Sequence, residues 1–149
     1  MKKQFVTILY LLLLSCQPNS TSIDSAYLGF ESHDGQVTIH TEKGDYHLIA
    51  YTDNIVETSF MPDNEIVTEK SHAVVLVPKA HFNIEETTDE ILLQTPGIVV
   101  SITKKPFKIT YFYKGKELIA ERKGYLKENG MEVLDFNISD DEVLWGGGA

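Results

Sequence analysis

The chain has 149 residues, of which 42% are apolar and 10% aromatic, and its formal net charge is −9. This composition excludes a disordered chain, a collagen-like chain and a protein with several membrane spans, and it predicts one globular domain. With 22 acidic against 13 basic residues, the sequence lacks the concentrated basic stretch that a nucleic-acid partner requires. The single cysteine, Cys16, excludes an intramolecular disulfide and a zinc site built from cysteine pairs.

Residues 1–15 have the organisation of a signal peptide. Lys2 and Lys3 form a basic head, and in the stretch Phe5–Leu14 only Thr7 is polar. As a helix, these ten residues would span about 15 Å, which is half of the roughly 30 Å hydrocarbon core of a bilayer. We therefore expect this segment to be cleaved rather than to span a membrane.

The end of this segment, Leu13-Leu14-Ser15-Cys16, resembles the bacterial lipobox, in which a diacylglycerol is attached to the cysteine before cleavage. The resemblance implies an exported lipoprotein anchored through Cys16, since two or more acyl chains hold a protein stably at a membrane. The alternative is an ordinary secretory signal with a cysteine near the cut by chance. In the lipoprotein interpretation, residues 16–25 are the lipidated cysteine and a flexible tether, and residues 26–149 are the folded domain. Gln17, in place of an aspartate after the cysteine, favours the outer membrane by resemblance.

The sequence that follows has the alternation of β-strands. Gln36–Thr41 and Asp45–Tyr51 predict a hairpin with its turn at Lys43-Gly44. Further strands are expected at Ile55–Phe60, Ala73–Val77, His81–Glu85, Glu90–Gln94, Ile98–Thr103, Lys108–Tyr113, Glu117–Glu121 and Met131–Ile138. Turn residues separate most of them, at Met61–Asn64, Thr95–Gly97, Lys114-Gly115 and Asn129-Gly130. No window shows a sustained helical stripe, so the sequence predicts an all-β antiparallel sandwich or barrel.

The carboxy terminus has an unusual composition. An acidic turn, Ser139–Glu142, leads into Val143-Leu144, then Trp145, and then three glycines and Ala149. A tryptophan followed by glycines is typical of a strand that leads into a close backbone approach. The alternative is a frayed tail that carries a surface tryptophan.

Residues from about Gln36 to Ala149 resemble the amino-terminal, galactose mutarotase-like β-sandwich of glycoside hydrolase family 31, the α-glucosidases and α-xylosidases. Three passages carry the resemblance: Leu48–Val56, Leu92–Ile102 leading into Lys105–Ile109, and Asp141–Ala149. The third is the most specific, because it is similar to the family's aspartate-glutamate, aromatic, glycine-any-glycine passage.

The resemblance implies a retaining glycosidase of α-linked oligosaccharides, with two catalytic aspartates on a (β/α)8 barrel that follows this domain. The chain contains no such barrel, so we expect it to have no catalytic residue, no cofactor and no metal, and to be inactive alone. Trp145, Gly146, Gly147 and Gly148 are by the same resemblance at the junction with the barrel or at the wall of its substrate cleft. Retaining chemistry needs two carboxyl groups about 5–5.5 Å apart. In an acidic run such as Asp140–Glu142 the side chains diverge into water from a turn, so we expect a solvated turn rather than a catalytic pair.

Two other functions are compatible with a small β-sandwich. A mutarotase would need a general acid and base, typically His and Glu; with a Lys43-Gly44 turn, His40 would stand opposite His47, either as a metal-binding pair or as a solvated pair. The second alternative is a complete lipoprotein that binds carbohydrate without catalysis. Tyr111 and Tyr113 share one face of their strand and are candidate sugar-stacking residues, unless they belong to the core.

Overall fold

The computed structural model describes residues 25–65, 75–128 and 130–143. All the regular secondary structure of these residues is β. The strands, in chain order, are β1 (Tyr27–His33), β2 (Gln36–Thr41), β3 (Gly44–Thr52), β4 (Ile55–Pro62), β5 (Asn83–Glu86), β6 (Glu90–Gln94), β7 (Ile98–Lys104), β8 (Phe107–Tyr113), β9 (Lys116–Glu121), β10 (Leu126–Glu128), β11 (Met131–Val133) and β12 (Phe136–Asn137).

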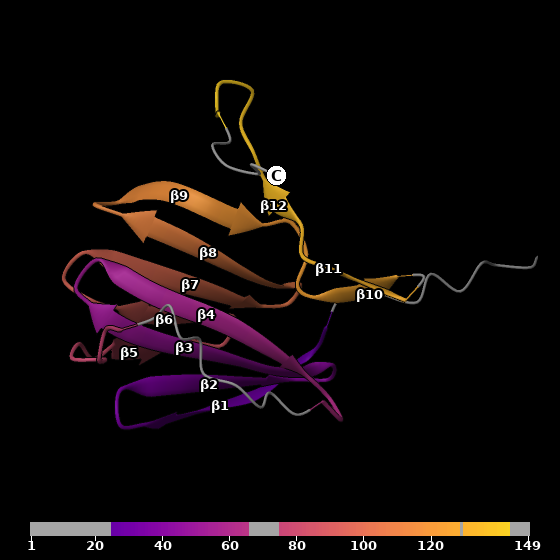
Figure 1. The fold of residues 1–149 in the computed structure, drawn as a ribbon, viewed down its shortest axis with the longest axis horizontal. Coiled ribbons are helices and arrows are strands. Elements are labelled where there is room, and N and C mark those ends of the chain that lie inside the picture. Colours follow the sequence, from indigo (N-terminus) through magenta and orange to yellow (C-terminus); the bar gives the residue numbers. More distant parts are fainter. Residues whose placement is uncertain (1–24, 66–74, 129, 144–149) are drawn as a thin grey trace, which may run out of the picture.

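The strands form two layers (Figure 1). The first sheet has four strands in the order β1-β2-β3-β4, and the second has six in the order β12-β9-β8-β7-β6-β5. A separate ribbon, β10-β11, extends to one side of the layers. Every paired strand is antiparallel to its neighbour. The expected all-β antiparallel sandwich is therefore confirmed.

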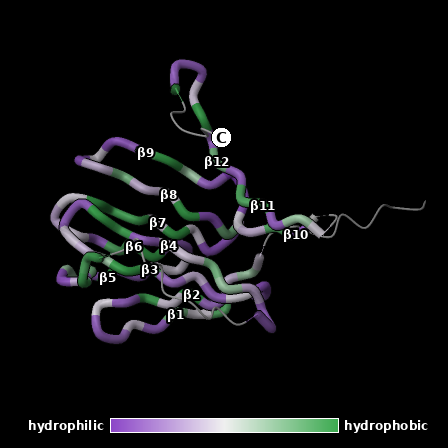
Figure 2. The backbone as a smooth tube through the Cα atoms, viewed as in Figure 1, coloured by the Kyte–Doolittle hydropathy of each residue, from purple (hydrophilic) through white to green (hydrophobic). Residues whose placement is uncertain are grey.

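The core lies between the two sheets, and strand alternation determines which residues enter it. In the first sheet, Ile39 and Leu48 are fully buried, whereas their chain neighbours on the other face are half-exposed. In the second sheet, Val100, Ile102 and Ile109 are fully buried against them. Figure 2 shows that the most hydrophobic stretches lie in the middle of the molecule, where the sheets face each other. Each such side chain contributes about 1.5–3 kcal/mol when it is removed from water.

Two of the hairpins have a turn type whose backbone twist matches the twist of the flanking strands. Asp34-Gly35 joins β1 to β2 with φ values of 50° and 81°, and Lys114-Gly115 joins β8 to β9 with φ values of 49° and 76°. A positive φ at both central residues is the signature of a type I′ turn. The turn predicted at Lys114-Gly115 is confirmed. Strand β1 was not predicted.

The turn predicted at Thr95–Gly97 is also confirmed, and it ties the two sheets together at one end. The Thr95 hydroxyl donates to the Asp53 carbonyl oxygen at 2.7 Å, and the Gly97 amide donates to the same oxygen at 3.1 Å. A Cβ at position 97 would lie 2.6 Å from that oxygen. Only glycine therefore allows this contact between the turn and the first sheet.

The β2–β3 hairpin has a different register from the predicted one. Thr41 pairs with Gly44, so the two-residue loop is Glu42-Lys43 and Gly44 lies in β3. Gly44 has a φ of 139°, and a Cβ there would lie 2.1 Å from the Met61 carbonyl oxygen. Position 44 therefore requires glycine because of the neighbouring strand β4, and not because of the turn.

This correction separates the two histidines. Moving the loop by one residue moves the pairing by two, so that His40 pairs with Asp45 and His47 pairs with Thr38. His40 Nδ1 lies 2.9 Å from Asp45 Oδ1, and His47 Nδ1 lies 3.1 Å from the Thr38 hydroxyl. The predicted His40–His47 pair was wrong.

Two predicted strands also differ from the structure. Residues 75–77 of the stretch predicted at Ala73–Val77 form no strand, and Val75 is 87% exposed; the rest of that stretch lies outside the described residues. The stretch Met131–Ile138 is divided at residues 134–135, because β11 pairs with β10 whereas β12 pairs with β9. The Asp135 carbonyl at this break accepts a hydrogen bond from the Arg122 amide at 2.8 Å. A hydrophobic, β-branched run predicts strand propensity, but it does not predict which partner strand is present.

Candidate functional site

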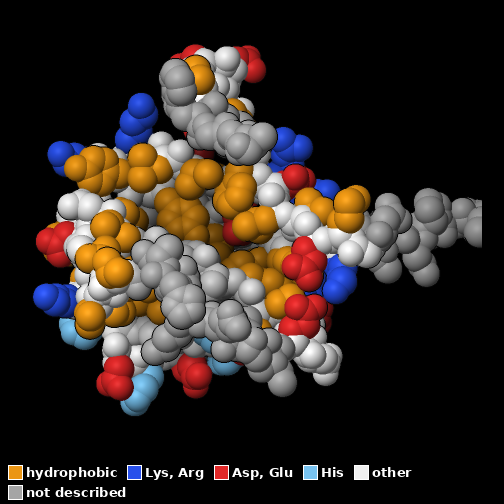
Figure 3. Space-filling view, viewed as in Figure 1, with side chains coloured by type: hydrophobic (Ala, Val, Ile, Leu, Met, Phe, Trp, Pro, Cys, Tyr) orange, Lys and Arg blue, Asp and Glu red, His pale blue; other side chains and the backbone are white. Residues whose placement is uncertain are grey.

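A pocket of about 390 Å³ opens between the sheets at one side of the sandwich. At the other side β1 lies against β5, where the Tyr27 hydroxyl contacts Glu86 at 3.5 Å. At the pocket side β4 lies against β8, where the Tyr111 hydroxyl donates to the Thr58 hydroxyl oxygen at 2.7 Å. The second sheet continues to β9 and β12, so it extends beyond β4, the edge strand of the first sheet. A hollow remains beside β4, under these two strands. Figure 3 shows hydrophobic side chains gathered in this hollow.

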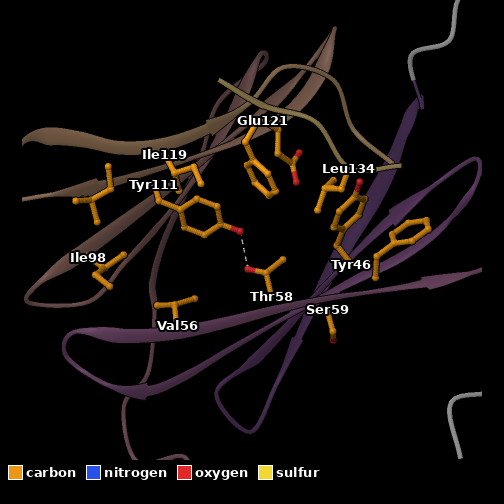
Figure 4. Close-up of a pocket in the computed structure, with 12 residues that line it drawn as sticks. Tyr46, Val56, Thr58, Ser59, Ile98, Tyr111, Ile119, Glu121 and Leu134 are labelled. Atoms are coloured by element: carbon orange, nitrogen blue, oxygen red, sulfur yellow. Dashed lines mark hydrogen bonds between the residues drawn. The ribbon is translucent and has the colours of Figure 1, made fainter. Parts of the chain in front are cut away.

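The walls of the pocket come from β3, β4, β7, β8, β9, β12 and the segment that leads into β12 (Figure 4). They consist mainly of apolar side chains with a few hydroxyl groups and one carboxyl group. The lining residues are Tyr46, Val56, Thr58, Ser59, Phe60, Ile98, Tyr111, Leu118, Ile119, Glu121, Leu134 and Phe136.

Tyr111 closes one wall of the pocket. Its ring points from β8 toward β4, where its hydroxyl meets Thr58 (Figure 4). Burial raises the pKa of Tyr111 to about 12, and the negative charge of Glu121 acts in the same direction. The hydroxyl therefore stays protonated at neutral pH, and it acts as a fixed hydrogen-bond donor between the two sheets.

Glu121 is the acidic group of the pocket. It is 2% exposed, and its Oε2 accepts a hydrogen bond from the Ile109 amide at 3.0 Å. Burial raises the pKa of this carboxyl to about 7, although the bond from Ile109 lowers it in part. Near neutral pH the pocket therefore holds a carboxyl group that is close to half protonated.

Tyr46 closes the opposite wall. Its ring lies 4.5 Å from that of Phe60 and 5.1 Å from that of Phe107, measured between ring centroids. Its hydroxyl accepts a hydrogen bond from the Tyr125 amide at 2.7 Å, and burial raises its pKa. The rim is apolar and open to solvent: Leu118 is 50% exposed and Leu134 is 45% exposed.

The structure places the candidate sugar-stacking residues Tyr111 and Tyr113 two residues apart on β8. Tyr111 lines the pocket, whereas Tyr113 pairs with Ile98 at the end of β8 and carries the Lys114 ammonium group 5.0 Å from its ring centroid. A role in sugar binding stays a prediction for both. The other candidate site residues, Cys16, Trp145, Gly146, Gly147 and Gly148, lie outside the described residues.

The described lining of the pocket is mainly apolar. Glu121 is the single carboxyl group among its described lining residues, whereas retaining hydrolysis of a glycoside needs two about 5–5.5 Å apart. The acidic run Asp140–Glu142 is exposed.

In residues 25–65, 75–128 and 130–143, no three His, Cys, Asp or Glu side chains gather into a group that could hold a metal ion. The same ranges contain no helix with the length and hydrophobicity of a membrane span.

Sequence reasoning missed Glu121, Thr58 and Tyr46 as pocket residues. Glu121 follows Ile119 at the spacing of one strand face, so a charged residue on an apolar face was the available signal. The packing of β4 against β8 depends on how the two sheets stack, and local alternation does not encode this stacking.

Comparisons with known proteins agree with the fold. Residues 45–149 match the family model of the glycosyl hydrolase 31 N-terminal galactose mutarotase-like domain. Alpha-glucosidase 2 of Bacillus thermoamyloliquefaciens is 31% identical over 123 residues, which are 80% of this chain and 16% of that protein.

Two solved structures share the fold at low sequence identity. A family 31 dextranase of Flavobacterium johnsoniae, solved with isomaltotriose, has a TM-score of 0.69 and 19% identity over 80% of this chain and 16% of its own. A family 31 α-xylosidase of Xanthomonas citri has a TM-score of 0.52 and 19% identity over 80% of this chain and 13% of its own. The chain thus spans about 16% of the length of the α-glucosidase and the dextranase. The match over residues 45–149 shows that the chain belongs to glycoside hydrolase family 31, where it corresponds to the N-terminal galactose mutarotase-like domain.

Proposed function

We propose that this chain is the opening domain of an exported α-glycosidase, and that it supports a catalytic barrel without supplying catalytic residues. The observation that carries the proposal is the family match over residues 45–149 in a chain that spans 16% of its α-glucosidase relative. The single carboxyl group among the described pocket residues agrees with a supporting role. In barrel enzymes, catalytic side chains stand at the carboxyl ends of the barrel strands, so a preceding sandwich contributes at most a wall.

The substrate class follows from the same relatives. Their names describe an α-glucosidase, a dextranase and an α-xylosidase, which act on α-linked sugars. We therefore propose an α-linked oligosaccharide as the substrate of the whole enzyme. Discrimination between glucosides and xylosides belongs to the barrel pocket.

The size of the native product tests this proposal. An antibody raised against this chain, used on membranes of the source organism, should detect a band several times heavier than the 16.8 kDa of the chain. The captured protein should hydrolyse p-nitrophenyl α-glucoside or α-xyloside, whereas the purified chain should hydrolyse neither. A native band at or below 16.8 kDa would contradict the proposal, and would favour a complete lipoprotein that binds carbohydrate.

We also propose that the enzyme is a lipoprotein, with residues 1–15 as its signal peptide, Cys16 as its lipidated residue and the outer membrane as its site. The support is the sequence Leu13-Leu14-Ser15-Cys16 behind a basic and apolar segment. In cells fed radiolabelled palmitate, the protein should become labelled and sediment with membranes. Cys16→Ser should abolish the label and release the protein, whereas Ser20→Ala, in the tether, should change neither. A Cys16→Ser protein that stays labelled would contradict lipidation at this cysteine.

A further inference from the structure

Another pocket, of about 360 Å³, lies at the turn between β3 and β4, at the left of Figure 1. Its lining residues are Tyr51, Thr52, Asp53, Asn54, Lys79 and Ala80, and we call it the Tyr51 pocket. Among the described residues, it has no lining residue in common with the apolar pocket beside β4. Its volume is within the range of about 300–1,000 Å³ that is typical of small-molecule sites.

The turn that forms this pocket is held in place by the second sheet. The Asp53 carbonyl oxygen accepts hydrogen bonds from the Thr95 hydroxyl and the Gly97 amide, at 2.7 Å and 3.1 Å. The Asn54 amide donates to the Thr52 hydroxyl oxygen at 3.2 Å. The Asn54 side chain lies against Gly97, where a Cβ would overlap its Oδ1. Because these contacts fix the turn in advance, a ligand that binds there has little backbone to order.

Tyr51 provides the aromatic wall of the pocket. Its side chain is half-buried and lies on the face of β3 that is turned away from the core. Its hydroxyl donates to Glu57 Oε2 on β4 at 2.9 Å, and this bond raises the pKa of Tyr51. The hydroxyl therefore stays protonated at neutral pH, and its bond to the neighbouring strand holds the ring in one orientation.

The rest of the lining is polar and carries both signs of charge. Asp53 and Lys79 have opposite charges, whereas Thr52 and Asn54 supply a hydroxyl and an amide, and all four residues are exposed. The two charges offset each other, so the pocket does not select an anion or a cation. Its side chains include both hydrogen-bond donors and acceptors. A neutral sugar ring matches this lining, because it presents an apolar face to an aromatic ring and several hydroxyl groups to polar side chains.

We propose that the Tyr51 pocket binds one sugar ring of an α-linked oligosaccharide. The apolar face of the sugar stacks on Tyr51, and its hydroxyl groups form hydrogen bonds with Asp53 and Lys79. That the ligand is a sugar follows from the lining residues, whereas the α-linkage rests on the proposed function. The chain thus binds carbohydrate by itself, which a purely supporting role would not require.

Titration of the ¹⁵N-labelled full chain with isomaltotriose, followed by NMR, tests the proposal. The backbone amide signals of Tyr51, Asn54 and Lys79 should shift together, with a Kd in the millimolar range. Tyr51→Ala removes the stacking ring and should weaken binding by about tenfold. Tyr51→Phe keeps the ring and should retain most of the affinity. Lys79→Gln should weaken binding several-fold, whereas Lys116→Gln, at an exposed lysine on β9, should leave the Kd unchanged.

Four results would overturn the proposal. They are the absence of shifts with isomaltotriose and maltotriose, shifts confined to other parts of the chain, an unchanged Kd in a folded Tyr51→Ala protein, and equally tight binding of the β-linked cellotriose. If Tyr51→Ala loses its far-ultraviolet β signal, the comparison of Lys79→Gln with Lys116→Gln decides instead.

These results are independent of the test of the proposed function. The Kd is measured on this chain, whereas the proposed function depends on the size of the native product. A native band at or below 16.8 kDa would leave a measured Kd intact, and a chain that binds no sugar would leave a heavier native band intact. The failure of one proposal can therefore be distinguished from the failure of the other.

Discussion

Raising the pH from about 4 to about 8 should lower the free energy of unfolding of this chain by about 3 kcal/mol through Glu121 alone. Burial raises the pKa of this carboxyl to about 7 in the folded state, against 4.5 for the exposed group. Below pH 4.5 the group is protonated in both states, so its burial has no ionic cost. Between these two values the unfolded chain releases the proton while the folded chain keeps it, and stability falls. Above pH 7 the cost is complete, at about 1.4 kcal/mol for each pH unit between the two values.

The substitution Glu121→Gln isolates this effect from the other acids. The amide oxygen can still accept the hydrogen bond from Ile109, but the side chain no longer ionises. Urea unfolding curves at several pH values should show that the stability difference between wild type and variant changes by about 3 kcal/mol across this range. Glu117→Gln, an exposed position on the same strand, should show no such change. A Glu121→Gln protein with the pH slope of the wild type would contradict the assignment.

Strand positions could be predicted from the sequence wherever local chemistry alone decides them. The turn at Lys114-Gly115 needs two residues with positive φ, and this requirement is local to the hairpin. Strands β6, β7 and β8 alternate or run apolar between such turns, so they were found with nearly their observed bounds. The resemblance to family 31 rested on Leu48–Val56, on Leu92–Ile102 leading into Lys105–Ile109, and on Asp141–Ala149, and the family match confirms it.

The features that were missed depend on contacts between distant parts of the chain. Gly44 was interpreted as a turn residue, but its glycine is needed because the carbonyl of Met61 lies against it in β4. The same error of one residue placed His40 opposite His47. Glu121 was predicted only as the last residue of a strand, although it is buried on the apolar face of the second sheet. In each case a second strand, which the local sequence does not specify, decides the outcome.

Tyr46→Ala should destabilise the fold by about 3–5 kcal/mol, the usual cost of truncating a large buried aromatic residue. Tyr46 is 1% exposed, and its ring packs on Phe60 from its own sheet and on Phe107 from the other. The cavity left by alanine would therefore open directly into the pocket that Tyr46 already lines. Thermal or urea unfolding of the full chain measures the loss.

Tyr46→Phe divides this cost between packing and hydrogen bonding. Phenylalanine keeps the ring contacts but removes the acceptor of the buried Tyr125 amide, which lies 2.7 Å from the hydroxyl. A buried donor without a partner costs about 1–3 kcal/mol, so Tyr46→Phe should be intermediate between wild type and Tyr46→Ala. Tyr51→Phe, which removes a hydroxyl that contacts Glu57 on the other face of β3, should have little effect. Equal stability of Tyr46→Phe and wild type would mean that the segment leading into β10 does not depend on this hydrogen bond.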